Sequence, residues 1–443
     1  MADETRSLIA HLFRRAAFGA RPADLDTYKA RGYEAAVTDL TSARPATGGN
    51  AGTKAVSELG VGNTGSDMGA ASDPGSLHDA QAVWVQAMVG AKAPLVERMT
   101  LFYADHFATA YNARDRIDLR ALNAQLATIR KHSMGSFRDL LHAMLDDLAL
   151  ACYLDNDANT KGAPNENLAR ELMELFVLGR GNYTETDVRE VARSLTGYTL
   201  QQTGGTGSNR TYKLVYEPAR HDAGSKTVLG VTGTFSPHQV LDVILRHPAA
   251  PRFVAGKLVA HFLAPTNATS AVDDVAEALV ANSWNVSAAL RTLFMTPMFR
   301  SSSVRDVLVK SPAEYVVGLM RALGRTEYKR AALYIENAGQ SLFRPPNVGG
   351  WPVGTEWLNA GSMLARYNAA AYFGRGHAGS PSPLAPATFD LPAWVETFGM
   401  TSIAPSTQSA LENYMQNMAS ESMATKRAGL VTMLATTPDF NLA

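Results

Sequence analysis

The chain has a single cysteine, Cys152, among its 443 residues. One cysteine cannot form an intramolecular disulfide, and it also excludes zinc or iron–sulfur sites built from cysteines and covalent c-type haem attachment. An excess of charge of one sign is missing too, because 41 Lys and Arg residues balance 41 Asp and Glu residues. Since binding to nucleic acid depends on a basic surface that displaces counterions, no nucleic-acid partner is expected.

Long hydrophobic runs are also absent. The sequence has no window of about 18 uninterrupted apolar residues, so no transmembrane segment is expected. The N-terminus differs from a secretory signal, because Asp3 and Glu4 come first and His11 interrupts the apolar residues that follow. As it stands the sequence is compatible with a cytoplasmic protein, and export to the periplasm is the alternative if a leader is missing.

Hydrophobic periodicity predicts a mainly α fold. Ser or Thr followed three residues later by an acidic residue or Gln predicts helix starts at Ser136, Thr184, Ser236 and Ser311. Apolar side chains at helical spacing predict further helices over 77–111, 251–264, 270–282, 286–296, 355–374, 408–418 and 424–436. We therefore expect one large multi-helical domain that covers residues 1–443.

Three segments differ from this helical pattern or extend it. Residues 46–76 contain few large apolar side chains and many small or polar ones, which predicts a flexible insertion. Strand signal occurs only at 211–216 and 226–229, which predicts one small β-hairpin excursion around 211–229. Residues 376–443 are expected to form a helical C-terminal extension.

The segment Pro164–Phe176 is the most informative one chemically. Glu166, Arg170 and Glu174 recur every four residues and would form one stripe of an α-helix, with Glu171 next to it. Carboxylates on adjacent helical turns are what a metal site or a general acid–base pair requires. The alternative is a structural ladder of Glu–Arg–Glu ion pairs.

The lead-in to this helix partly matches a calcium-binding loop. Oxygen-bearing side chains occupy the first, third and fifth positions from Asp155, and Glu166 occupies the twelfth. Thr160 stands where the sharp turn of such a loop requires Gly. We therefore interpret these residues mainly as turn formers that bond to their own backbone.

Two histidine segments are further candidates. His106 lies in an aromatic, apolar helical stretch, where a histidine is either a ligand or a hydrogen-bonded core residue. His221, Asp222 and Lys226 bring three ionisable groups together in the expected connection of the hairpin, and loops often carry function.

The segment Gln340–Trp357 cannot form a regular helix. Three prolines and three glycines fix its path, and Trp351 and Trp357 are unfavourable to leave exposed. Such a rigid loop either lines a pocket or packs as a strap over the core. Gln340 and Asn347 would add polar groups to a pocket of this kind.

Taken together, several of these segments resemble those of the bacterial domain-of-unknown-function 1800 family. The resemblance runs from about residue 8 to 375 and rests on 11–19, 105–107, 153–156, 161–176, 183–187, 194–197, 221–226, 310–314 and 345–351. Two positions depart from the family pattern: Asp105 stands where the family often has Asn, and Tyr198 where it usually has Trp. The resemblance implies a fold rather than an activity. It also implies, by analogy, a partner from the domain-of-unknown-function 1501 family, which looks like a sulfatase- or phosphatase-type protein.

Two functional hypotheses follow. The first is an enzyme with a polar pocket of carboxylates and histidines that binds an anionic or polar substrate, with a divalent metal (Fe, Mn, Mg, Zn or Ca) as its expected cofactor. The second is a non-catalytic binding or assembly partner whose Glu–Arg–Glu helix is structural. The residues expected to form the site are His106, Glu171, His221 and Asp222 as catalytic groups, Asn167, Arg170, Lys226, Gln340, Asn347, Trp351 and Trp357 as substrate-binding groups, and Glu166, Glu174 and His106 as metal ligands.

Overall fold

The computed structural model describes residues 2–44, 76–112, 117–206, 210–263, 268–375, 386, 388–418 and 420–443. Within these ranges most residues are helical, and the strands form two small two-stranded antiparallel sheets. The predicted mainly α fold class is therefore confirmed. The predicted flexible insertion over 46–76 lies outside the described residues, except for Ser76, the N-cap of α5.

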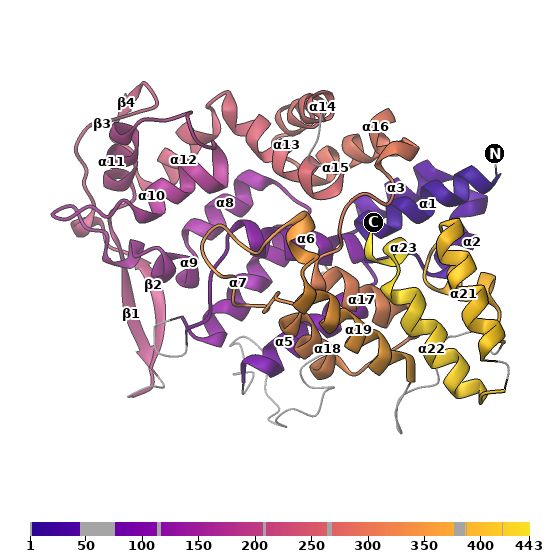
Figure 1. Cartoon of the computed structure of the whole chain (residues 1–443). Helices are drawn as coiled ribbons and strands as arrows, with labels where there is room; N and C mark the ends of the chain where they lie inside the picture. The colour runs from indigo at the N-terminus through magenta and orange to yellow at the C-terminus, as the bar shows by residue number, and fades with distance from the viewer. Residues whose placement is uncertain are drawn as a thin grey trace.

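The first half of the described chain is built from helices, and the strands follow after them (Figure 1). Its helices are α1 (Ala2–Ala16), α2 (Pro22–Arg31), α3 (Tyr33–Ser42), α5 (Leu77–Val89), α6 (Pro94–His106), α7 (Leu119–His132), α8 (Phe137–Leu145), α9 (Leu148–Tyr153), η1 (Asn156–Ala158), α10 (Asn167–Glu171), η2 (Leu172–Val177) and α11 (Glu185–Ser194).

The second half begins with the strands and continues with helices to the end of the chain. Its elements are β1 (Tyr198–Gly204), β2 (Thr211–Tyr216), η4 (Pro218–Arg220), β3 (Lys226–Val228), β4 (Val231–Gly233), α12 (Pro237–Leu245), α13 (Ala249–Phe262), α14 (Thr269–Ala281), α15 (Val286–Met295), α16 (Pro297–Arg300), η5 (Ser302–Val304), α17 (Pro312–Leu323), α18 (Tyr328–Asn337), η6 (Gly354–Trp357), α19 (Ala360–Arg375), α20 (Leu391–Thr397), α21 (Pro405–Asn417), α22 (Met423–Thr436) and α23 (Pro438–Asn441).

The four predicted helix starts are confirmed. The side chains of Ser136, Thr184, Ser236 and Ser311 each accept the backbone N–H three residues later, as N-caps of α8, α11, α12 and α17. The stretch predicted as helical over 77–111 is divided instead, because α6 restarts at Pro94, which fits the first turn of a helix and not its interior.

The strand pairing differs from the predicted hairpin. β2 pairs with the preceding β1, whereas β3 pairs with the following β4. The two segments at 211–216 and 226–229 therefore belong to separate sheets, and His221 and Asp222 connect one sheet to the other. The pairing was missed because β1, with the sequence Tyr-Thr-Leu-Gln-Gln-Thr-Gly, has little of the apolar alternation that indicates a strand.

Two hydrophobic cores meet at α6, which Figure 1 shows near the centre of the molecule. One core includes side chains of α1, α3, α8 and α12–α15. The other includes side chains of α5, α17, α19 and α22. Consecutive residues of α6 face the two cores, Phe102 the first and Leu101 the second. α6 therefore places its side chains at the seam between the cores.

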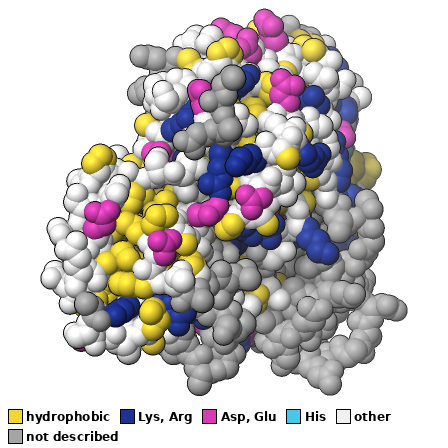
Figure 2. All heavy atoms as spheres, turned by 90° about the vertical axis from the view of Figure 1, so that its right-hand side faces the viewer, with side chains coloured by type: hydrophobic (Ala, Val, Ile, Leu, Met, Phe, Trp, Pro, Cys, Tyr) yellow, Lys and Arg dark blue, Asp and Glu magenta, His cyan; other side chains and the backbone are white. Residues whose placement is uncertain are grey.

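The surface agrees with the balanced composition. On the face shown in Figure 2, Lys and Arg side chains are interspersed with Asp and Glu side chains, and apolar side chains gather below them. None of the described helices combines the length and the apolar character that crossing a membrane requires.

Candidate functional site

The predicted Glu166–Glu174 stripe is divided between two kinds of helix. α10 ends at Glu171 and continues directly into η2, which is a π-helix. A π-helix has a wider turn than an α-helix, so the α-helical spacing of four residues applies to Glu166 and Arg170 but not from Leu172 onwards. Glu174 lies in the π-helical part, so the predicted stripe does not continue in regular α-helical geometry as far as this residue.

Arg170 joins two carboxylates at the surface. Its guanidinium lies 3.1 Å from Glu166 and 2.8 Å from Glu185 of α11. Glu174 instead pairs with Arg180 at 2.6 Å. Each of these ion pairs has at least one partner whose side chain is 40% or more exposed, and ion pairs at the surface contribute little to stability.

Glu171 and Asn167 do not join these ion pairs. Burial, followed by the nearby charge of Glu174, raises the pKa of Glu171. Asn167 Nδ2 donates to Asp155 Oδ2 at 2.9 Å. Asp155 and Glu166, the first and twelfth positions of the calcium-loop pattern, thus both bind protein groups.

His106 is a core residue. Its Nε2 lies 3.1 Å from the carbonyl oxygen of Phe176, and the side chain is buried. Burial, with a smaller contribution from the charge of Lys257, lowers the pKa of His106 to about 3. The imidazole is surrounded by the rings of Phe102, Tyr103, Phe107, Phe137 and Phe176. The imidazole is therefore neutral and held by a backbone oxygen.

The expected metal ligands are not brought together. His106 points into the core, whereas Glu166 and Glu174 bind arginines near the surface. Among the residues that the structure describes, no group of three or more His, Cys, Asp or Glu side chains is placed to hold a metal ion.

His221, Asp222 and Lys226 are fastened to the neighbouring backbone and to α11. His221 Nδ1 lies 2.9 Å from the carbonyl oxygen of Thr196, and Asp222 pairs with Arg193 at 2.7 Å. The buried Lys226 donates to two carbonyl oxygens of the same loop. These contacts hold the loop in place, and none of them involves His106 or Glu171.

The strap Gln340–Trp357 does line a cavity, as one of the two alternatives for this segment predicts. Gln340, Trp351 and Trp357 are all part of the cavity wall. Asn347 is exposed instead, and its side chain accepts the N–H of Gly349 in a turn of the strap. The strap is not wholly irregular, because it ends in the short 3₁₀ turn η6.

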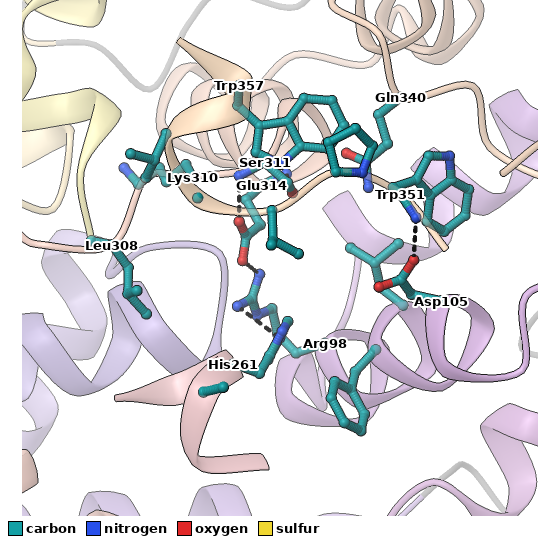
Figure 3. A pocket seen from close by; sticks show the side chains of 18 of the residues that line it. Arg98, Asp105, His261, Leu308, Lys310, Ser311, Glu314, Gln340, Trp351 and Trp357 are labelled. Atoms are coloured by element: carbon teal, nitrogen blue, oxygen red, sulfur yellow. Dashed lines mark hydrogen bonds and ion pairs between the residues drawn. The ribbon is translucent and has the colours of Figure 1, made fainter. Parts of the chain in front are cut away.

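The cavity lies at the seam between the two cores and has a volume of about 130 Å³. That volume holds several water molecules or a small ligand. Side chains reach it from α1, α6, α13, α17, the segment before α17 and the strap (Figure 3). Its charged and polar lining residues are Arg15, Arg98, Asp105, His261, Lys310, Ser311, Glu314 and Gln340.

An ion pair with a histidine behind it occupies one side of this cavity. Arg98 pairs with Glu314, and Arg98 Nη2 lies 3.3 Å from His261 Nε2. Glu314 also accepts the N–H of Ser311, which completes the capping box of α17. Burial raises the pKa of Glu314, but Arg98, His261 and the hydrogen bond from Ser311 together outweigh it, and the pKa falls to about 2. Burial, followed by the charge of Arg98, lowers the pKa of His261 to about 3.

Asp105 lies on the opposite side of the cavity. It accepts the backbone N–H of Trp351 at 2.7 Å and is held close to Gly350 (Figure 3). In the described part of the chain it forms no ion pair. Burial raises the pKa of Asp105 to about 6, and the hydrogen bond from Trp351 and the charge of Lys257 oppose this only in part.

Two further cations stand in the cavity wall. Arg15 Nη2 donates to the carbonyl oxygen of Val304 at 2.6 Å, and the side chain is buried. Lys310 Nζ donates to the carbonyl oxygen of Phe440 at 2.5 Å and lies 4.0 Å from the centre of its ring. Burial lowers the pKa of Lys310 to about 7. The cavity wall therefore combines cations and carboxylates whose side chains are mostly buried.

Four of the segments that carry the family resemblance meet at this cavity. Arg15, Asp105, Lys310 with Glu314, and Trp351 come from the segments 11–19, 105–107, 310–314 and 345–351. Of the predicted site residues, only Gln340, Trp351 and Trp357 of the strap line the cavity, because the other charges come from segments far apart in the sequence. Arg98 and His261 lie outside every quoted motif, so no sequence signal could have found them.

Comparison with known proteins identifies the family of the chain but no activity. A family model described as "Protein of unknown function (DUF1800)" matches residues 11–442, nearly the whole chain. The match confirms the resemblance seen in the motifs and extends it over the C-terminal helices. No curated protein and no solved structure matches the chain.

Proposed function

Because the chain belongs to the DUF1800 family of proteins of unknown function, we propose its function from the cavity itself. We propose that the cavity binds a small polar ligand and that Asp105 exchanges a proton with this ligand. The observation that carries the proposal is the convergence of buried charges from separate parts of the chain on one cavity.

Burying charged side chains is unfavourable, so several of them around one cavity require an explanation. Moving an ion out of water costs several kcal/mol, and well-packed apolar residues often replace buried ion pairs without loss of stability. Here Arg15, Arg98, Lys310 and Glu314 surround a space that also contains the carboxyl of Asp105. Perturbed titratable groups that share a cleft are typical of binding and catalytic sites.

The two carboxyl groups have different environments, which supports different roles. Glu314 is paired with Arg98 and stays ionised, so it can accept hydrogen bonds from a ligand. The raised pKa of Asp105 leaves both its protonated and its ionised form populated near pH 6, as a general acid or base requires. Since the family often has Asn at position 105, proton transfer is proposed for this chain, and ligand binding is the part that other members could share.

The aromatic wall suits a ligand with both polar and apolar surface. Trp351 and Trp357 are buried next to the carboxylates, and binding sites of enzymes commonly combine an apolar lining with a few polar groups. A small hydroxylated molecule or a small acid with an apolar face matches this combination.

A second candidate is a binding or assembly function without chemistry. Arg170 contacts only protein carboxylates, Glu166 and Glu185 of α11, which supports a role in joining the two helices rather than in chemistry. In this case the cavity would bind its ligand unchanged. A partner from the domain-of-unknown-function 1501 family stays a prediction under either candidate.

The proposal is tested by blocking the cavity. Ala260 lines the cavity on α13 and is exposed, so Ala260→Phe narrows the cavity without removing a buried contact. Ala281→Phe, at an exposed position at the end of α14, is the matched control. The melting temperatures of the wild type and both variants are measured with a panel of monosaccharides, hydroxy acids, amino acids and small phosphates.

We expect at least one class of compound to raise the melting temperature of the wild type and of Ala281→Phe, but not that of Ala260→Phe. Compounds that bind are then incubated with the protein and followed by NMR. Conversion by the wild type but not by Asp105→Asn supports the enzyme, whereas binding without conversion favours the second candidate. If no compound distinguishes Ala260→Phe from the control, the cavity is not a binding site.

A further inference from the structure

Two histidines and two aspartates form a continuous chain between α8 and α12. His142 Nδ1 and His238 Nδ1 lie 2.8 Å apart. The other ring nitrogen of each histidine faces a carboxylate: His142 Nε2 lies 3.0 Å from Asp242, and His238 Nε2 lies 3.3 Å from Asp146. None of the four residues lines the cavity described above.

The two imidazole rings meet end to end. Their planes differ by 8°, and their centroids are 5.1 Å apart. The distance between the centroids is about equal to the distance between the two Nδ1 atoms plus one ring radius at each end. Both Nδ1 atoms therefore lie on the line that joins the two centroids. In-plane, in-line contact at this distance is the geometry of an N–H···N hydrogen bond.

The number of protons follows from the partners. Burial raises the pKa of Asp146 and of Asp242, but their hydrogen bonds outweigh it, and both pKa values are lowered. Ionised carboxylates only accept, so Nε2 of both histidines carries a proton. A hydrogen bond between the two Nδ1 atoms requires one more proton. Three protons on four nitrogens make one imidazolium and one neutral imidazole.

We propose that His142 and His238 form a pH-dependent clamp, which holds α12 against α8 while the two histidines share one proton between their Nδ1 atoms. If this proton is lost, two nitrogen lone pairs face each other. If a second proton is gained, two N–H groups and two positive charges face each other. In both cases the contact turns from attractive to repulsive.

The surrounding charges favour the singly protonated contact. Arg138 pairs with Asp242 at 2.8 Å and lies 3.9 Å from Asp139, so the carboxylate of Asp242 is fixed in place. The hydroxyl of Tyr198, at the start of β1, donates to Asp146 at 2.7 Å. These groups keep both carboxylates ionised and aimed at the two rings.

The direction of the pH dependence follows from His238. Its hydrogen bond to Asp146 raises the pKa of His238 above the usual 6.5. While the pair holds its shared proton, a raised histidine pKa contributes stability that is lost as the pH rises through the raised value. The clamp is therefore expected to open on the alkaline side of neutrality, and α12 would then loosen from α8.

The first experiment observes the protons directly. A long-range ¹H–¹⁵N correlation spectrum is recorded on the full chain labelled with ¹⁵N-histidine, with His142→Asn and His238→Asn used for assignment. We expect both Nε2 atoms to be protonated and the two Nδ1 atoms to share one strongly deshielded proton at pH 6.5. Two independent neutral histidines, or signals that change when EDTA removes a metal ion, would overturn the proposal.

The second experiment measures the opening of the helices. Hydrogen exchange of α8 and α12 is followed by mass spectrometry from pH 6 to 9 and corrected for the intrinsic pH dependence of exchange. We expect roughly tenfold or more additional opening at pH 9 in the wild type and in His78→Asn, a surface control. Both clamp variants should show the open behaviour at every pH. A wild-type profile without pH dependence would contradict the clamp, even if one clamp variant fails to fold.

Discussion

The ion pair in the cavity wall gives the sharpest energetic prediction. In Glu314→Gln the neutral amide can still accept the N–H of Ser311, so the helix cap is kept. Arg98, whose side chain is only 3% exposed, loses its carboxylate partner. Leaving one member of a buried ion pair uncompensated costs about 3–5 kcal/mol of unfolding free energy.

The assay is urea unfolding followed by circular dichroism, at pH 7 and at lower pH. The pKa of Glu314 is lowered to about 2 in the folded chain, so its contribution is present above the unfolded value near 4.5 and is lost as the pH falls toward 2. The difference between the wild type and Glu314→Gln should therefore be largest at pH 7 and shrink in acid. Glu166→Gln, which removes an exposed partner, serves as the control.

The double variant Arg98→Met with Glu314→Gln separates the pair from other effects of the change. Removal of both charges should restore much of the stability, because no uncompensated ion is left. If the free energy of unfolding of Glu314→Gln is within about 1 kcal/mol of the wild-type value at pH 7, the Arg98–Glu314 pair is not buried as described.

Two further changes test how the strap and the 221–226 loop are held. Gly350→Ala should lower the free energy of unfolding by about 1–3 kcal/mol, because Gly350 has φ 91° and a Cβ there would overlap Asp105. Thermal unfolding measures this loss, and an unchanged melting temperature would refute it. Lys226→Met should lower the free energy of unfolding by about 1–3 kcal/mol, because two carbonyl oxygens lose their buried donor. If the variant is as stable in urea as the wild type, water replaces the amine.

The helices were predictable because their signals are local. Ser236-Pro-His-Gln and Ser311-Pro-Ala-Glu place a capping side chain, a proline and a returning carbonyl or carboxylate in one turn, and the structure has full capping boxes at both. The break before Pro94 was not predicted, because apolar side chains keep their helical spacing on both sides of it.

The site was harder to predict because its contacts are long-range. Arg98 pairs with Glu314 from more than 200 residues away, and His261 comes from a third helix. Within one helix, the spacing of Glu166 and Glu174 suggested one set of ion pairs, but Glu174 lies in a π-helical turn and pairs with Arg180 instead. The strap was found from composition alone, since prolines, glycines and two tryptophans already restrict where such a segment can lie.

The measurement that tests the central claim most directly is the stability of Asp105→Asn as a function of pH. The pKa of Asp105 is raised to about 6, so its charge opposes folding, and wild-type stability should fall as the pH rises from about 4 to about 6. Asn can still accept the N–H of Trp351 but carries no charge. We predict that Asp105→Asn equals the wild type near pH 4 and is more stable at pH 7, by up to about 3 kcal/mol. If Asp105→Asn is instead less stable at every pH, the carboxylate is a structural contact, and its assignment as the proton-transfer group of the cavity is wrong.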